Sequence, residues 1–159
     1  MNALGLDAVG YPGHLTLRAA KPEDFDFLYG LHRAVFQDYV AQVWGWNEAW
    51  QEEHYRQQFN PSANQIISLE GRDAGVIRVS ETESEVFLSN IEVLPEFQGS
   101  GLGTSLIRAL LAHARRFNKP VLLQVLKVNP AQRLYLRLGF SIVGESETHY
   151  LMKASPEGV

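Results

Sequence analysis

Hydrophobic and polar positions change their period several times along the chain, and each change marks a predicted element. Residues 14–20 alternate well enough to predict a first strand. From Pro22 onward apolar residues recur at helical spacing, and acidic residues in the first turn suit the positive end of a helix dipole. A second helix is expected to begin at Asn47, whose side chain can cap it, and to run toward Phe59, before Pro61 interrupts it.

The pattern then changes from helical to strand-like. Successive antiparallel strands are predicted at Gln65–Glu70, Ala74–Glu81 and Glu85–Val93, with turns at residues 71–73 and 82–84. A glycine-rich segment follows at residues 98–103 and opens a strongly amphipathic helix. The apolar stripe of that helix consists of Leu102, Leu106, Ile107, Leu110, Leu111 and Ala114.

The last third of the chain predicts a buried strand, a short helix and two further strands. Val121–Leu126 is almost continuously apolar, which is typical of a strand covered on both faces. Asn129 can cap a helix whose first turn holds a proline, and Gly139 is a natural stop for it. Residues 140–153 then read as two strands around a polar turn at residues 145–148.

Size and composition place these elements in one globular domain. The chain has 159 residues, 45% of them hydrophobic and 20% charged, with no internal repeat or linker. We expect a flexible leader over residues 1–13 and a single domain over residues 14–159.

Charge and rare residues narrow the chemistry. The net charge of −4 and the lack of a basic block make nucleic acid an unexpected partner. Cysteine is absent and the five histidines are scattered, so no metal site is expected. No signal-peptide layout or membrane-length apolar run is present, which predicts a cytoplasmic protein without a membrane partner. We expect a monomer or homodimer.

The glycine-rich turn is the strongest candidate for a binding site. Glycines that open a helix present several backbone N–H groups and the positive end of the helix dipole to one point, which suits an anion such as phosphate. A P-loop would need a lysine before its Ser or Thr, but Thr104 follows Gly103 directly. A dinucleotide motif would need a different glycine spacing and an acidic residue about twenty positions later, yet no Asp follows Asp73.

A third pattern fits this segment. Gln98-x-x-Gly101-x-Gly103 resembles the signature of the GNAT superfamily of N-acetyltransferases, whose loop holds the pyrophosphate of coenzyme A. The residues that lead into it, Ile91-Glu-Val-Leu-Pro-Glu-Phe-Gln98, are similar to the family's lead-in. Asn129-Pro-Ala-Gln-Arg-Leu-Tyr-Leu-Arg-Leu-Gly-Phe140 resembles its second motif. Two motifs at the proper separation are far more specific than one glycine loop.

The resemblance implies an α/β (mixed α+β) GNAT fold. Its central sheet would have six or seven mostly antiparallel strands, splayed between the fourth and fifth strands and flanked by four helices. It also implies an acyltransferase that moves an acetyl group from acetyl-CoA, its co-substrate, to a primary amine of a small molecule or peptide, in a ternary complex and without a metal.

Coenzyme A contacts follow residue by residue from the same resemblance. Backbone groups of residues 91–93 would pair with the pantetheine arm, and the N–H of Val93 would polarise the thioester carbonyl. Asn129 would hydrogen-bond the pantetheine arm, or cap its helix, or both. The residues expected to contact the cofactor are Ile91, Glu92, Val93, Gln98, Gly99, Ser100, Gly101, Leu102, Gly103, Thr104, Asn129 and Tyr135.

Tyr135 is the expected general acid. Attack of an amine on a thioester expels a thiolate, which a nearby hydroxyl can protonate, and the resemblance places that role on this tyrosine. Its spacing from Ala131, Leu134 and Leu138 is equally that of a packing residue.

The general base is less defined. Glu85 matches the base of the histone-acetylating branch, counted back from Gln98 without gaps, and Glu92 is a second candidate. Either could instead be a solvated strand residue, and several GNAT enzymes deprotonate through water. The branch that acetylates ribosomal-protein N-termini has a glutamate where this chain has Gln124, which disfavours protein N-termini as acceptors.

The acceptor site is expected beside the first two helices. Trp44 and Trp46 are candidates to bind an ammonium group through their aromatic faces, or else to pack in the core, and Ser89 is a candidate on the strand before the glycine loop. Trp50 is expected in the core. Two other functions stay open at this point: a non-catalytic coenzyme A-binding module on a GNAT scaffold, and a protein that binds ATP or NAD through the glycine loop.

Overall fold

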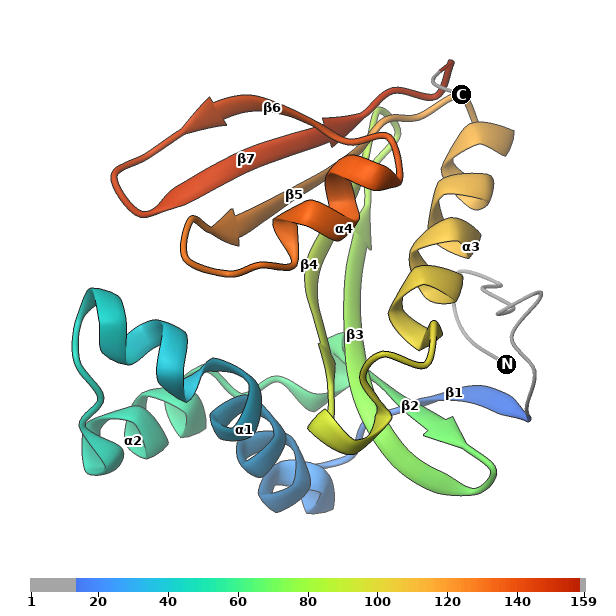
Figure 1. Cartoon of the computed structure of the whole chain (residues 1–159). Helices are drawn as coiled ribbons and strands as arrows, with labels where there is room; N and C mark the ends of the chain where they lie inside the picture. The colour runs from blue at the N-terminus through green and yellow to red at the C-terminus, as the bar shows by residue number, and fades with distance from the viewer. Residues whose placement is uncertain (1–13, 158–159) are drawn as a thin grey trace.

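The computed structural model describes residues 14–157, so the leader predicted at residues 1–13 lies outside the described residues. The elements are β1 (Leu15–Ala19), α1 (Phe25–Val43), α2 (Glu48–Gln58), β2 (Gln65–Leu69), β3 (Arg72–Glu81), β4 (Val86–Val93), α3 (Leu102–Arg116), β5 (Val121–Leu126), α4 (Gln132–Arg137), β6 (Ser141–Glu145) and β7 (His149–Ala154). Their order and type confirm the pattern predicted from the sequence (Figure 1).

One seven-stranded sheet runs through the molecule in the order β1-β2-β3-β4-β5-β7-β6. Neighbouring strands are antiparallel except β4 and β5, which are parallel. The predicted fold, a mostly antiparallel sheet splayed between its fourth and fifth strands, is confirmed.

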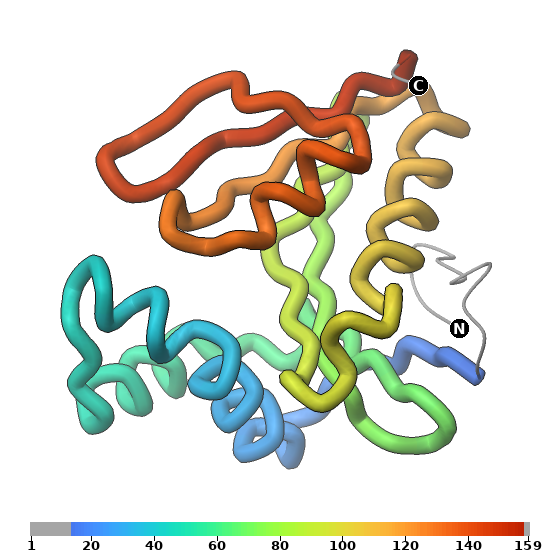
Figure 2. The backbone as a smooth tube through the Cα atoms, in the orientation of Figure 1, coloured from blue at the N-terminus to red at the C-terminus, as the bar shows by residue number. Residues whose placement is uncertain are grey.

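The splay begins at a β-bulge. β4 and β5 pair only over three positions, Val86–Leu88 against Val121–Leu123. At the next residue, Ser89, the register of β4 against β3 shifts by one, since Val79 faces Leu88 but Arg78 faces Asn90. A bulge bends its strand and increases its twist, so β4 turns away from β5 there. Figures 1 and 2 show the two strands starting side by side and then diverging.

Helices cover both faces of the sheet. α1 packs Leu28 and Leu31 onto Ile66 and Val76, in a small core to which α2 adds partly buried aromatic residues. On the opposite face α3 supplies the larger core. Its predicted stripe is confirmed, with five of the six residues buried: Leu102, Leu106, Ile107, Leu110 and Ala114.

Two local predictions need correction. The first hairpin turns at Glu70 and Gly71, both with positive φ (52° and 78°), so β3 begins at Arg72 rather than after residue 73. Two consecutive left-handed residues make the tight turn that matches strand twist. Trp50 is not a core residue: it is 57% exposed and stacks on His54, because α2 buries none of its residues.

The end of the molecule away from the splay is held by an ionic cluster. Glu81, at the end of β3, accepts a hydrogen bond from Lys119 Nζ (2.6 Å) and lies 2.9 Å from His113 Nε2 on α3. The bond from Lys119, and then that from His113, lowers the pKa of Glu81 below its ordinary value of 4.5, although partial burial opposes the shift. The cluster ties α3 and the start of β5 to β3.

We expect Glu81→Gln to destabilise the protein in a pH-dependent way. A carboxyl whose pKa is lower in the folded state stabilises it above the unfolded-state pKa and loses that effect as the pH falls through the folded-state value. The melting temperature of the variant should therefore be lower by about 3 to 6 °C at pH 7, and the difference should shrink below about pH 4.5. Glu83→Gln, in the exposed neighbouring turn, is the matched control. A difference independent of pH would contradict this role.

Candidate functional site

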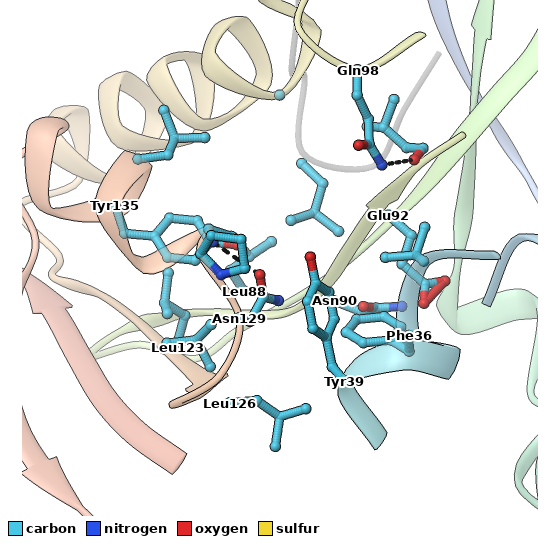
Figure 3. A pocket seen from close by; sticks show the side chains of 18 of the residues that line it. Phe36, Tyr39, Leu88, Asn90, Glu92, Gln98, Leu123, Leu126, Asn129 and Tyr135 are labelled. Carbon is cyan, nitrogen blue, oxygen red and sulfur yellow. Dashed lines mark hydrogen bonds between the residues drawn. The ribbon is translucent and has the colours of Figure 1, made fainter. Parts of the chain in front are cut away.

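The divergence of β4 and β5 opens a cavity of about 1040 Å³. Its walls come from the second half of β4, the second half of β5, the start of α3, and parts of α4 and α1. Figure 3 shows side chains from these elements converging on one space, with Tyr135 and Asn129 on one side and Asn90 and Glu92 on the other. A space of this size can hold a large, elongated ligand.

One wall of the cavity is an unpaired strand edge. Backbone groups of successive strand residues point to opposite sides. The N–H of Leu94 donates to the carbonyl of Ala74 on β3 (2.8 Å), so Ile91 and Val93 direct their own N–H and C=O groups away from β3. On that side β4 has already parted from β5. This edge can therefore hydrogen-bond an extended ligand as a neighbouring strand would.

The glycine-rich turn lies at the end of this edge. Gly99 and Gly101 have φ of 77° and 86°, left-handed values that glycine adopts without strain. Gln98 Nε2 donates to the carbonyl of Val93 (2.8 Å) and so fastens the turn to β4. The N–H groups of the first turn of a helix have no partner within it, and those of α3 border the cavity. Of the predicted cofactor contacts in this turn, the structure brings to the cavity Gln98, Gly99, Gly101, Leu102, Gly103 and Thr104, but not Ser100.

Asn129 and Tyr135 lie on the opposite wall. Asn129 accepts a hydrogen bond from the N–H of Ala131 (2.9 Å), so it caps the turn before α4 and borders the cavity as well. Tyr135 is buried, packs against Phe140 and lines the cavity. Burial raises the pKa of its hydroxyl to about 12. The phenol therefore keeps its proton at neutral pH and can donate it.

The structure separates the two candidate bases. Glu85 lies in the turn before β4, at the end where β4 and β5 are paired, and it does not border the cavity. Its position argues against the base role suggested by counting back from Gln98. Glu92 borders the cavity and is buried, with Oε2 3.1 Å from His32 Nδ1 on α1.

Of the three residues predicted on the acceptor side, two line the cavity and one does not. Trp44 and Ser89 line the cavity, Trp44 with 60% of its surface exposed. Trp46 is not among the lining residues; it lies beside His32, 6.4 Å between ring centroids, and donates to Glu48.

The sequence analysis expected the first two helices beside the acceptor site, but it missed the α1 residues that line the cavity. His32, Phe36 and Tyr39 all line it, and Figure 3 shows Phe36 and Tyr39 beside Asn90 of β4. Phe36 was identifiable only as part of an apolar stripe. The spacing of His32 and Phe36, one helical turn apart, was the available signal that they share a face.

Within residues 14–157, no three His, Asp or Glu side chains gather in a way that could hold a metal ion. No helix in the same range has the length and apolar character to cross a membrane.

Comparison with known families decides what kind of protein carries this cavity. A model of the acetyltransferase (GNAT) family matches residues 26–140, which span the chain from α1 to the end of the second motif. The chain belongs to the acetyltransferase (GNAT) family. The resemblance inferred from the two motifs is thus confirmed. A comparison with curated protein sequences gave no match.

Solved structures of GNAT proteins share the fold at low sequence identity. The PaiA N-acetyltransferase of Thermoplasma acidophilum, in complex with coenzyme A, is 15% identical with a TM-score of 0.71, over 89% of this chain and 99% of that one. The ribosomal-protein-S18-alanine N-acetyltransferase of Escherichia coli is 19% identical with a TM-score of 0.62, over 89% and 94%. A GNAT acetyltransferase of Listeria monocytogenes is 18% identical with a TM-score of 0.60, over 89% and 94%. At these identities the likeness concerns the fold.

The position of the strand edge depends on Gly75 of β3. A Cβ atom added there would lie 2.2 Å from the backbone carbonyl oxygen of Glu92. We expect Gly75→Ala to push β4 away from β3 at Glu92 and Val93 and to destabilise the protein by about 1 to 3 kcal/mol, a typical cost of overpacking. Thermal unfolding measures this effect. Gly144→Ala is the control, because its added Cβ would meet Leu151 at an ordinary 3.8 Å. Equal melting temperatures for the two variants would show that β4 yields without strain.

Proposed function

We propose that this GNAT protein transfers an acetyl group from acetyl-CoA to a primary amine of a small molecule or peptide, by direct attack in a ternary complex within the single domain formed by residues 14–159. The observation that carries the proposal is the unpaired β4 edge at Ile91 and Val93, which leads directly into the N-terminus of α3. A ligand with an extended amide-bearing arm and a pyrophosphate matches both features. Coenzyme A has this chemistry.

The cofactor would lie along the cavity. Its pantetheine amides would pair with the backbone of residues 91–93, and its pyrophosphate would accept hydrogen bonds from the N–H groups at the glycine-rich turn. The N–H of Val93 points into the cavity and would polarise the thioester carbonyl, which gains negative charge during attack. Asn129 would orient the arm from the opposite wall.

The chemistry then needs an acid on the cofactor side and proton removal on the acceptor side. Tyr135 can supply the acid, since its buried phenol holds a proton at neutral pH and borders the same cavity. Of the two glutamates considered, Glu92 alone borders the cavity. Trp44, Phe36 and Tyr39 give the acceptor side an aromatic surface, which suits an ammonium group.

Cofactor binding is tested most cleanly at Gly103. Gly101 has a left-handed φ, so any replacement there would strain the backbone as well as block the cofactor, and one measurement could not separate the two effects. Gly103 lies within α3 and a side chain there would project into open space, so Gly103→Leu should improve helix propensity while filling the pyrophosphate position. We expect the dissociation constant of acetyl-CoA, measured by calorimetry, to rise about tenfold or more.

The matched control is Gly30→Leu in α1, where an added Cβ atom also meets nothing within 4 Å and where the residue does not border the cavity. It should bind acetyl-CoA like the wild type. If Gly103→Leu does so too, the cofactor does not occupy this turn and the proposal fails.

Turnover is tested at Tyr135. Tyr135→Phe keeps the packing surface and removes only the hydroxyl, so kcat should fall about 10²-fold while acetyl-CoA affinity changes little. Release of coenzyme A is followed with spermidine, lysine, kanamycin and a lysine-containing peptide as acceptors. Tyr150→Phe, on β7 outside the cavity lining, serves as the control. Full activity in Tyr135→Phe would reduce this residue to packing, and a wild type that binds acetyl-CoA but acetylates no amine would indicate a non-catalytic module.

A further inference from the structure

Glu92 is unusual among the buried residues of the chain. Among residues 14–157 the buried polar or charged side chains are Ser68 and Glu92, and only Glu92 can carry a charge. Its side chain is 1% exposed, and Oε1 has no hydrogen-bond partner among the described residues. Burying a carboxylate without full pairing costs several kcal/mol.

The single polar contact of this carboxylate is with His32. Glu92 Oε2 lies 3.1 Å from His32 Nδ1, across the interface of β4 and α1. When Glu92 is ionised, its carboxylate can only accept hydrogen bonds, so Nδ1 then carries the shared proton. The other ring nitrogen, Nε2, is then the unprotonated one and has the lone pair of a base.

Aromatic packing fixes the ring of His32 at the border of the cavity. The imidazole packs among Phe36, Tyr55 and Trp46, with ring centroids 5.2, 5.1 and 6.4 Å away. Its side chain is still 26% exposed, and the residue lines the cavity. The ring is thus held at two points, by aromatic packing and by the Nδ1 contact, and the residue is partly exposed at the border of the cavity.

We propose that His32 is the general base that deprotonates the acceptor amine and that Glu92 is the positioning residue that fixes its tautomer and orientation. This inference rests on the proposed acetyl transfer and deepens it. It transfers the expected base role from a glutamate to a histidine that the glutamate orients.

Titratable groups face His32 from two neighbouring elements. Glu92 contacts the ring from β4, and Tyr55 packs against it from α2. Arg78 of β3 interacts electrostatically with Tyr55. Glu48 accepts a hydrogen bond from Trp46, which lies beside the ring. Burial, and then the negative charge of Glu92, raises the pKa of Tyr55, so its phenol is neutral at physiological pH. The carboxyl group of Glu92 is therefore the titratable group in direct contact with the imidazole.

The acceptor ammonium gives one proton to His32 Nε2, and the free amine attacks the thioester carbonyl carbon. As the C–N bond forms and the C–S bond breaks, the electron pair of the C–S bond leaves with sulfur, and the thiolate takes a proton from Tyr135. The second proton lost by the nitrogen restores Tyr135, and the imidazolium releases its proton to solvent.

The test compares pH–rate profiles of purified full-length variants with the most active of the four amines named above. At pH 7, His32→Gln should lower kcat/KM for the amine about 10²-fold or more. The deficit should shrink as the pH approaches that of a free alkyl amine, about 10, because deprotonation then needs no base. Glu92→Gln keeps the side-chain shape but removes the charge, so it should shift the acidic limb of the profile and lower kcat/KM about tenfold.

His54→Gln is the matched control. His54 is exposed on α2, stacks on Trp50 and does not line the cavity, so its profile should equal that of the wild type. Acetyl-CoA affinity, measured by calorimetry, should stay within about twofold of wild type in all three variants. A second measurement needs no variant: nitrogen NMR of ¹⁵N-labelled histidine should find His32 with its proton on Nδ1.

The outcomes separate the two proposals. A His32→Gln enzyme whose deficit is absent, or equal at every pH, would overturn the inference while wild-type turnover upholds acetyl transfer. An Nε2-protonated tautomer of His32 would also overturn it. A wild-type protein that binds no acetyl-CoA would overturn the proposed function, and the base role with it.

Discussion

The separation of β4 from β5 is the constraint on which the rest of this structure depends. Parallel pairing stops after Leu88 and Leu123, at the point where Ser89 adds an extra residue to β4 opposite β3. A sheet that stayed paired there would bury its backbone groups in a ladder and leave no ligand edge. Because β4 remains bound to β3 and β5 to β7, the strands part without either losing its outer neighbour, and the free edges face one cavity.

Packing on the two faces of the sheet keeps this opening in place. The larger core beneath α3 and α4 fixes the glycine-rich turn and Tyr135 on one side. The smaller core beneath α1 and α2 fixes His32 against Glu92 on the other. Glu81 and Lys119 close the paired end of the strands. The cavity is therefore bordered by elements that are each anchored elsewhere, which is the arrangement that preorganised sites require.

The chemistry of the cavity follows the same division. The walls formed by the β4 edge and α3 offer backbone N–H groups, which suit a cofactor recognised by amides and phosphates. The wall formed by α1 offers aromatic rings and a buried carboxylate–imidazole pair, which suit a cationic amine. A donor and an acceptor could thus approach the N–H of Val93 from different sides, as the direct attack proposed above requires.

The sequence by itself determined the elements and the cofactor side of the site. The period at which hydrophobic positions recur predicts nearly every strand and helix, because the burial of one face is a local property of each segment. The glycine-rich turn and the motif around Asn129 and Tyr135 are each contiguous, so their spacing alone indicates the family. This is why the family, the fold and the lining of the cavity by Gln98, Gly101 and Asn129 agree with expectation.

Only the tertiary structure decided the acceptor side. Glu92 and His32 are sixty residues apart, and no periodicity shows that a strand residue bracketed by Ile91 and Val93 turns its carboxylate toward a helix. Counting along the strand likewise favoured Glu85, but the bulge and the short pairing with β5 place that residue at the closed end. Register between non-adjacent strands and packing between a helix and a sheet are long-range properties, because they depend on how all the elements share one core.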